Sequence, residues 1–107
     1  MMGPLVICDI RRKWRGQGLV TFWRPTNNGY CYPLSWAGHY SPEDVARELS
    51  YYAVKEGGRW QRFPVTLAFA MALAVPPSPG QIDGDAGPVV RNTRENRAKL
   101  VAARIHL

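Results

Sequence analysis

The alternation of hydrophobic and polar positions predicts a strand-rich N-terminal part of the chain. Residues 5–10 form a short run of β-branched and apolar residues, which is typical of a strand. A polar, glycine-containing connection follows, and residues 19–23 form a second strand candidate. We expect these two strands to pair as a hairpin with four basic residues and Trp14 at its tip. After turn residues at 25–29, residues 30–32 form a short third strand candidate.

The clearest helix start in the chain lies at residues 41–44. Ser41 is a good N-cap, Pro42 suits the first helical position, and the two acidic residues that follow favour the positive end of the helix dipole. Apolar residues then recur at helical spacing until Gly57-Gly58, which indicates a helix stop. The sequence therefore predicts a helix over residues 42–54.

The next segment mixes strand and helix patterns. Residues 59–65 are typical of a strand, and Pro64 limits that strand to a sheet edge or a strand end. Residues 67–74 alternate large and small side chains, which is a strand pattern, but their Ala, Leu and Met content favours a helix. We predict a short helix over 66–74. Because this helix is apolar on every side, either the core or a second subunit docked on segment 66–75 must cover it.

The C-terminal part begins with a Pro/Gly/Asp-rich loop over residues 76–88, which we expect to be mobile. Val89-Val90 suits a short strand, and Asn92, as an N-cap, opens a predicted helix over 93–104. Its expected buried face consists of Ala98, Val101, Ala102 and Ile105.

These elements together predict one α+β domain spanning residues 1–107. Its core is a small antiparallel sheet with about three helices packed on it. The length and the 46% hydrophobic content are enough for a core of this kind.

Charge and cysteine content narrow the setting. The net charge of +6 favours approach to a polyanion or to an acidic protein face, although it also serves solubility. Cys8 and Cys31 lie among apolar or aromatic residues, so we expect two buried free thiols in a reducing compartment. The longest apolar run, residues 65–75, is too short to span a bilayer, so we expect a soluble intracellular protein without a membrane partner.

Catalytic and metal-binding patterns are weak in this sequence. Cys31 and His39 are the nearest Cys–His pair and have no zinc-site spacing. Gly16-Gln17-Gly18 precedes a strand, which is the wrong context for a dinucleotide fingerprint. Asp83 and Asp85 have the oxygens that a divalent cation prefers, but a solvated turn explains them more simply. We therefore predict no enzyme activity, no metal and no cofactor.

Binding chemistry is better represented. Residues 11–15 combine four cations with one tryptophan, the composition that grips phosphates and stacks on a base; the alternative is a solvated loop. The aromatic segment 22–40 adds arginine and stacking residues; the alternative is that its aromatic residues form the core. The candidate binding residues are Arg11, Arg12, Lys13, Trp14, Arg15, Trp23, Arg24, Tyr30, Tyr32 and His39.

The aromatic segment also carries a resemblance. The residues concerned are Phe22-Trp23-Arg24-Pro25, Gly29-Tyr30, Leu34, Ala37-Gly38, Tyr40-Ser41 and Glu43. This pattern resembles a motif of small uncharacterised proteins encoded by tailed bacteriophages and prophages. Phe63-Pro64-Val65 and Val90 with Asn92-Thr93 match less specifically, and the Pro/Gly/Asp insertion departs from the pattern.

The resemblance implies a phage accessory protein that acts in the cytoplasm of an infected or lysogenic bacterium. Small proteins of this kind often block host defence by binding, and anti-CRISPR proteins are the best-known example. We therefore expect a non-catalytic inhibitor that occupies a surface of a host protein or ribonucleoprotein complex. The alternatives are direct binding of DNA or RNA, and a pocket that sequesters an anionic nucleotide signal.

Overall fold

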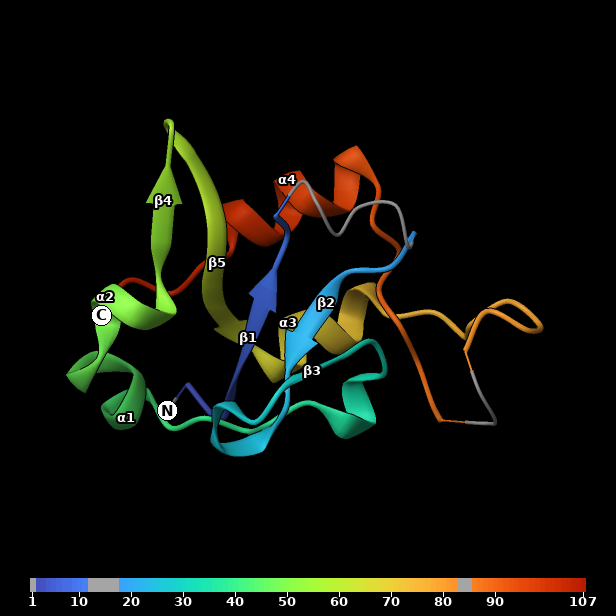
Figure 1. Cartoon of the computed structure of the whole chain (residues 1–107), viewed down its shortest axis with the longest axis horizontal. Helices are drawn as coiled ribbons and strands as arrows, with labels where there is room; N and C mark the ends of the chain where they lie inside the picture. The colour runs from blue at the N-terminus through green and yellow to red at the C-terminus, as the bar shows by residue number, and fades with distance from the viewer. Residues whose placement is uncertain (1, 12–17, 83–85) are drawn as a thin grey trace.

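The computed structural model describes residues 2–11, 18–82 and 86–107 and confirms the predicted α+β class (Figure 1). The strands are β1 (Leu5–Asp9), β2 (Thr21–Trp23), β3 (Tyr30–Cys31), β4 (Val54–Glu56) and β5 (Arg59–Thr66). The helices are α1 (Pro42–Arg47), α2 (Leu49–Tyr52), α3 (Leu67–Leu73) and α4 (Arg94–Ala102). Single 3₁₀ turns occupy Pro25–Asn27 and Leu34–Trp36.

All five strands belong to one sheet in the order β3-β2-β1-β5-β4, and every neighbouring pair is antiparallel. The predicted pairing of the first two strands is confirmed, because Cys8 lies opposite Phe22. Of the predicted basic tip over residues 11–15, the structure describes Arg11, whereas residues 12–15 lie outside the described part of the chain.

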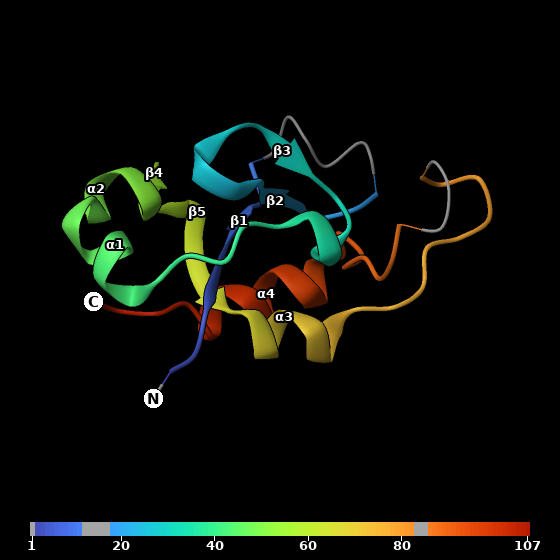
Figure 2. The ribbon, with the colours of Figure 1, turned by 90° about the horizontal axis from the view of Figure 1, so that it is seen from below.

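One face of the sheet carries the larger core. Cys8 lies opposite Phe22 on β2 and opposite Phe63 on β5, and Phe22 in turn lies opposite Cys31 on β3. These four side chains are buried in one cluster together with Leu100 of α4. Helices α3 and α4 cover this face and are grouped together in Figure 2, apart from α1 and α2.

The other face is covered only in part. Leu5, Ile7 and Trp23 are buried there with Val45 of α1 and Tyr52 of α2. Around Asp9, at the end of β1, the face carries the side chains of Arg11, Tyr30 and Arg62, together with Tyr51 from α2. This half-covered face positions the candidate site described below.

The predicted helix over 42–54 is wrong in its second half. Its start is confirmed, because the Asp44 backbone N–H donates to the Ser41 hydroxyl at 3.1 Å. Glu48 then leaves helical geometry with φ −126° and ψ 39°, which divides the segment into α1 and α2. Residues 54–56 form β4, because they pair with β5 and thereby satisfy their backbone groups. Gly57-Gly58, with positive φ at both positions, is therefore the turn of a hairpin.

The later helices confirm the predicted type and correct some details. Helix α3 lies where it was expected, but Met71 is 46% exposed, so the core covers only part of this helix. Helix α4 is capped by Thr93 rather than by Asn92, because the Asn96 backbone N–H donates to the Thr93 hydroxyl. Its fully buried residue is Leu100, and Val101 of the predicted face packs against the same core, whereas Ala98 and Ala102 are exposed.

Pro64 lies near the end of β5, beyond the residues that pair with β4, so its missing N–H interrupts no strand pairing there. Its carbonyl accepts the Ile105 backbone N–H.

None of the helices in the described ranges has the length and apolar character needed to cross a bilayer.

A tight joint connects β2 with the approach to α1. Gly38 donates its N–H to the Trp23 carbonyl, and an added Cβ at Gly38 would lie 2.7 Å from the Tyr40 ring and 2.8 Å from Pro25. The Tyr40 hydroxyl donates to the Arg24 carbonyl and accepts the Asn27 backbone N–H. The joint therefore holds the turn after β2 against the strand that leads into α1.

The buried row across the sheet predicts a large effect of truncating Phe22. We expect Phe22→Ala to lower the free energy of unfolding by about 3–5 kcal/mol, because it removes a fully buried ring and leaves a cavity in the larger core. Urea unfolding measures the loss. Met71→Ala is the matched control and should cost less than about 1 kcal/mol, because Met71 is exposed. Equal losses in the two variants would contradict the assignment of the core.

Candidate binding site

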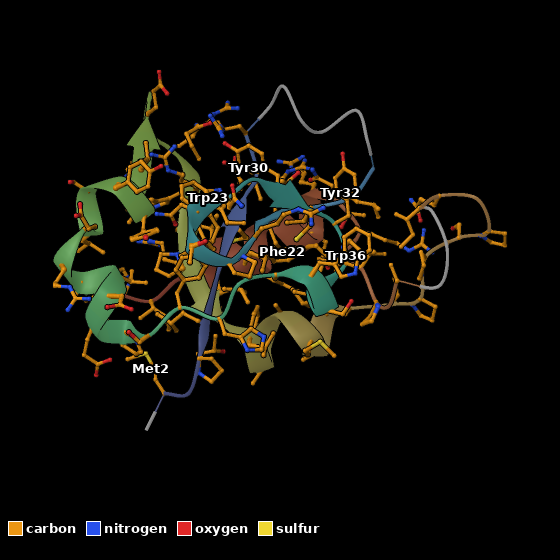
Figure 3. All side chains as sticks on the ribbon, turned by 60° about the horizontal axis from the view of Figure 1, so that its bottom comes forward. Met2, Phe22, Trp23, Tyr30, Tyr32 and Trp36 are labelled. Atoms are coloured by element: carbon orange, nitrogen blue, oxygen red, sulfur yellow. The ribbon has the colours of Figure 1, made fainter. Side chains whose placement is uncertain are left out.

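The structure describes only some of the predicted binding residues and divides them among separate places. Arg12, Lys13, Trp14 and Arg15 lie outside the described residues. Arg11, Trp23 and Tyr30 come together on the half-covered face of the sheet, and Figure 3 shows Trp23 and Tyr30 beside each other. The remaining predicted residues, Arg24, Tyr32 and His39, lie elsewhere and are described in turn below.

The buried carboxylate of Asp9 forms an ion pair with the partly exposed Arg11 in this region. The Asp9 carboxylate is fully buried, and Arg11 binds it in a fork through Nε at 2.9 Å and Nη2 at 2.7 Å. The Arg11 backbone N–H donates to the same carboxylate at 3.2 Å. The hydrogen bonds to Asp9 raise the pKa of Arg11 further above its ordinary value. Asp9 therefore fixes the Arg11 guanidinium and compensates its charge.

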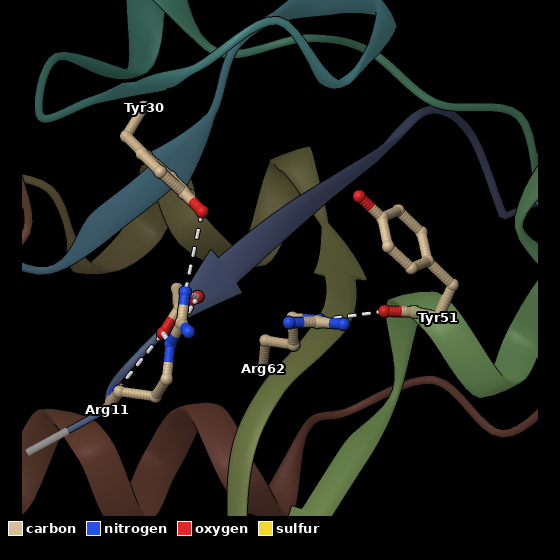
Figure 4. Close-up of polar contacts among 5 residues, drawn as sticks. Arg11, Tyr30, Tyr51 and Arg62 are labelled. Atoms are coloured by element: carbon tan, nitrogen blue, oxygen red, sulfur yellow. Dashed lines mark hydrogen bonds and ion pairs between the residues drawn. The ribbon is translucent and has the colours of Figure 1, made fainter.

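A second arginine lies beside this pair without a carboxylate. Arg62 lies directly opposite Asp9 across the β1–β5 pair, yet its guanidinium carbon is 5.2 Å from the Trp23 ring centre and 5.0 Å from that of Tyr51. Its Nε donates to the Tyr51 carbonyl at 2.7 Å (Figure 4). Two aromatic rings and one backbone carbonyl therefore hold the Arg62 guanidinium plane in place.

Two tyrosines flank this arrangement and reach the solvent. Tyr30 is 47% exposed and Tyr51 46% exposed, and both rings meet Trp23 edge-on, at 6.1 Å and 5.4 Å between ring centres. The Tyr30 hydroxyl accepts a long hydrogen bond of 3.5 Å from Arg11 (Figure 4). Below them, the buried Trp23 indole Nε1 has no hydrogen-bond partner among the described residues. We call this surface the arginine–tyrosine face; it consists of Asp9, Arg11, Tyr30, Tyr51 and Arg62.

A smaller patch lies at the outer edge of β3. The Arg24 guanidinium carbon is 5.1 Å from the Trp36 ring centre, and Trp36 is 45% exposed. The Arg24 Nε donates to the Tyr30 backbone carbonyl at 2.8 Å. We call Arg24 and Trp36 the Trp36 patch. Tyr30 links it to the arginine–tyrosine face, because its carbonyl contacts Arg24 and its hydroxyl contacts Arg11.

His39 is exposed and lines a groove of about 460 Å³ between the Pro25–Asn27 turn and α1. Asp44, Arg47 and Glu48 also line it, and Arg47 forms an ion pair with Asp44. The remaining acidic side chain makes this groove unfavourable for a phosphate. The backbone at Thr26, on the groove's rim, has a left-handed φ of 57° that a β-branched residue rarely adopts.

The two thiols are free and buried, as the sequence predicts. Burial strongly raises the pKa of Cys8 and raises that of Cys31 to about 11. A thiol with a raised pKa and no access to solvent is a poor nucleophile. Tyr32, half-buried after β3, also has its pKa raised by burial. Within the described part of the chain, no group of three or more His, Cys, Asp or Glu side chains has the arrangement for a metal ion.

Comparison with protein-family models, with curated proteins and with solved structures found no match.

The sequence reasoning missed Asp9, Tyr51 and Arg62. The alternation of side chains along β1 could have indicated the position of Asp9, because Asp9 follows Cys8 and must point to the opposite face of the sheet. The pairing of Asp9 with Arg62 depends on a register between strands that are more than fifty residues apart. Tyr51 falls within the predicted helix over 42–54, and the pattern of that helix does not indicate that the Tyr51 ring lies against Arg62.

The buried carboxylate predicts an unequal effect of two similar substitutions. Asp9→Asn removes the charge that Arg11 binds, and we expect it to lower the free energy of unfolding by about 1–3 kcal/mol. Asp44→Asn, which removes the carboxylate of an exposed pair, should cost less than about 1 kcal/mol. Urea unfolding of both variants checks this. A cost for Asp9→Asn no larger than for Asp44→Asn would show that the Arg11 fork adds no stability.

Cys31 predicts a loss of stability in alkaline solution. The folded protein holds the Cys31 proton more tightly than the unfolded chain does, because its pKa is about 11 instead of 9.0. The unfolded state therefore loses this proton first, and the free energy of unfolding falls as the pH rises from about 9 to about 11. Urea unfolding across this range should show a shallower decline for Cys31→Ala. Parallel declines would exclude the Cys31 contribution.

Proposed function

We propose that this chain is a non-catalytic binding protein that docks on a protein surface of a bacterial host complex and inhibits that complex by occupying the surface. The arginine–tyrosine face and the Trp36 patch are its working surfaces. The resemblance of residues 22–43 to phage accessory proteins supports a bacterial host, and a defence complex of the CRISPR type is the target class that the resemblance suggests.

The observation that carries this proposal is the combination of exposed aromatic rings with arginines that are already fixed. Tyr30, Trp36 and Tyr51 are each nearly half exposed although they are large and partly apolar. Tyr, Trp and Arg are the residue types that contribute most to the energy of protein–protein interfaces. Because Arg24 and Arg62 are held by stacking and by backbone carbonyls, docking costs them little conformational entropy.

The charge of the described surface favours a protein partner over a nucleic acid. Asp9 compensates the charge of Arg11, so Arg62 is the uncompensated cation of the arginine–tyrosine face. Proteins that bind the nucleic-acid backbone usually neutralise several phosphates. The net charge of +6 and the basic run at residues 11–15 nevertheless favour direct DNA or RNA binding as the second candidate function.

A nucleotide pocket is the weakest of the three candidates. The groove beside His39 has Glu48 in its wall in addition to the Asp44–Arg47 ion pair, and the Glu48 carboxylate opposes a phosphate group. The buried state of both thiols supports the non-catalytic part of the proposal.

Affinity capture from a nuclease-treated bacterial lysate tests the proposed function. We expect the wild-type chain to retain a protein partner at elevated salt. The double variant Tyr30→Ala/Tyr51→Ala should retain at least about tenfold less of this partner, because two exposed aromatic side chains are lost from the docking surface. Met71→Ala is the control, since it removes an exposed apolar side chain from α3, on the opposite side of the sheet. Rescue of phage growth on a CRISPR-immune host by the wild-type chain alone would extend the result to inhibition.

Two outcomes would contradict the proposal. If nuclease abolishes capture and raised salt weakens it steeply, the partner is a nucleic acid. If the double variant captures the same partner as well as the wild-type chain does, the arginine–tyrosine face is not the docking surface.

A further inference from the structure

Arg62 is a cation whose expected partner within the chain is already taken. Residues directly opposite each other on antiparallel strands share a face, and an Asp opposite an Arg normally pairs with it. Asp9 lies in that position opposite Arg62. Its carboxylate is bound instead by the Nε, Nη2 and backbone N–H groups of Arg11. No ion pair of the described residues includes Arg62.

The Arg62 guanidinium is nevertheless held in a fixed orientation. Its plane lies against Trp23 and Tyr51, and its Nε is bound to the Tyr51 carbonyl. The two terminal nitrogens, with about four N–H donors, have no partner among the described residues. A guanidinium held in this way presents a ready fork to two oxygens of one anionic group. The exposed Tyr51 beside it adds an aromatic wall.

We propose that Arg62 binds a carboxylate of the partner protein, so that an acidic segment of that partner docks on the arginine–tyrosine face. This inference rests on the proposed function and names the chemistry of its partner. Charge complementarity supports it, because the chain carries a net charge of +6 and the acidic group of this face, Asp9, is buried under Arg11. A single uncompensated fork suits one Asp or Glu side chain, whereas a nucleic-acid backbone requires a series of cations.

The experiment uses the full chain and two short peptides as probes. One peptide contains Glu residues within a neutral sequence, and the other has Gln at the same positions. The Arg62 Nε–H and the Tyr51 ring are followed by NMR during titration. We expect a saturable shift with the Glu peptide and none with the Gln peptide. Inorganic phosphate and a single-stranded oligothymidylate, titrated in parallel, distinguish a general anion site and a nucleic-acid site.

A conservative substitution makes the test specific to the fork. Arg62→Lys keeps the charge but loses the planar donors and the stacking, so we expect binding of the Glu peptide to weaken by about tenfold. Arg59→Lys is the matched control on the same strand, where the exposed Arg59 side chain makes no ion pair among the described residues, and it should change the affinity by less than about twofold.

Each remaining outcome overturns the inference. Equal binding by Arg62→Lys and Arg59→Lys would show attraction by net charge alone. Equal shifts with the Gln peptide would exclude a carboxylate, and tighter binding of the oligothymidylate would assign the face to nucleic acid. The proposed function survives these results if a protein partner is still captured through Tyr30 and Tyr51. If no protein partner is captured through Tyr30 and Tyr51 while the Glu peptide still binds, the proposed function is contradicted and the present inference is not.

Discussion

The register of β1 against its two neighbours determines which side of the sheet each important side chain occupies. Cys8 lies opposite both Phe22 and Phe63, so the even-numbered side chains of β1 enter the core beneath α3 and α4. Asp9, one residue further, points to the other face. A slip of one residue would exchange the two sets and place this carboxylate in the apolar core. The same register brings Arg62 opposite Asp9, so the candidate surface and the core depend on one set of strand pairings.

Local signals in the sequence predicted much of this fold. The strand at residues 5–10 and the cap at Ser41 depend on neighbouring residues, and both were predicted correctly. The second half of the predicted helix over 42–54 was wrong, because β4 owes its structure to hydrogen bonds with β5, which a local pattern does not contain. The cap at Thr93 was missed by one position for a different reason, since Asn92 and Thr93 are both good capping residues.

The candidate site was less predictable than the fold, because it is assembled from distant segments. Arg11 and Tyr30 were predicted as binding residues from their residue types. Arg62 becomes a candidate binding residue only because Asp9, which lies opposite it, is bound by Arg11 instead. The aromatic segment was predicted as either core or surface, and the structure divides it. Trp23 is buried, while Tyr30 and Trp36 are nearly half exposed. That division follows from the end of β2 and the two turns, which no periodic pattern indicates.

The joint around Gly38 links the architecture of this protein to one of its candidate surfaces. An added Cβ at Gly38 would lie 2.7 Å from the Tyr40 ring and 2.8 Å from Pro25, so the joint admits no side chain at that position. Arg24 belongs to the same joint, because its carbonyl accepts the Tyr40 hydroxyl, while its guanidinium lies over the Trp36 ring. The absence of a side chain at one position is therefore a requirement shared by the bend of the chain and by the Trp36 patch.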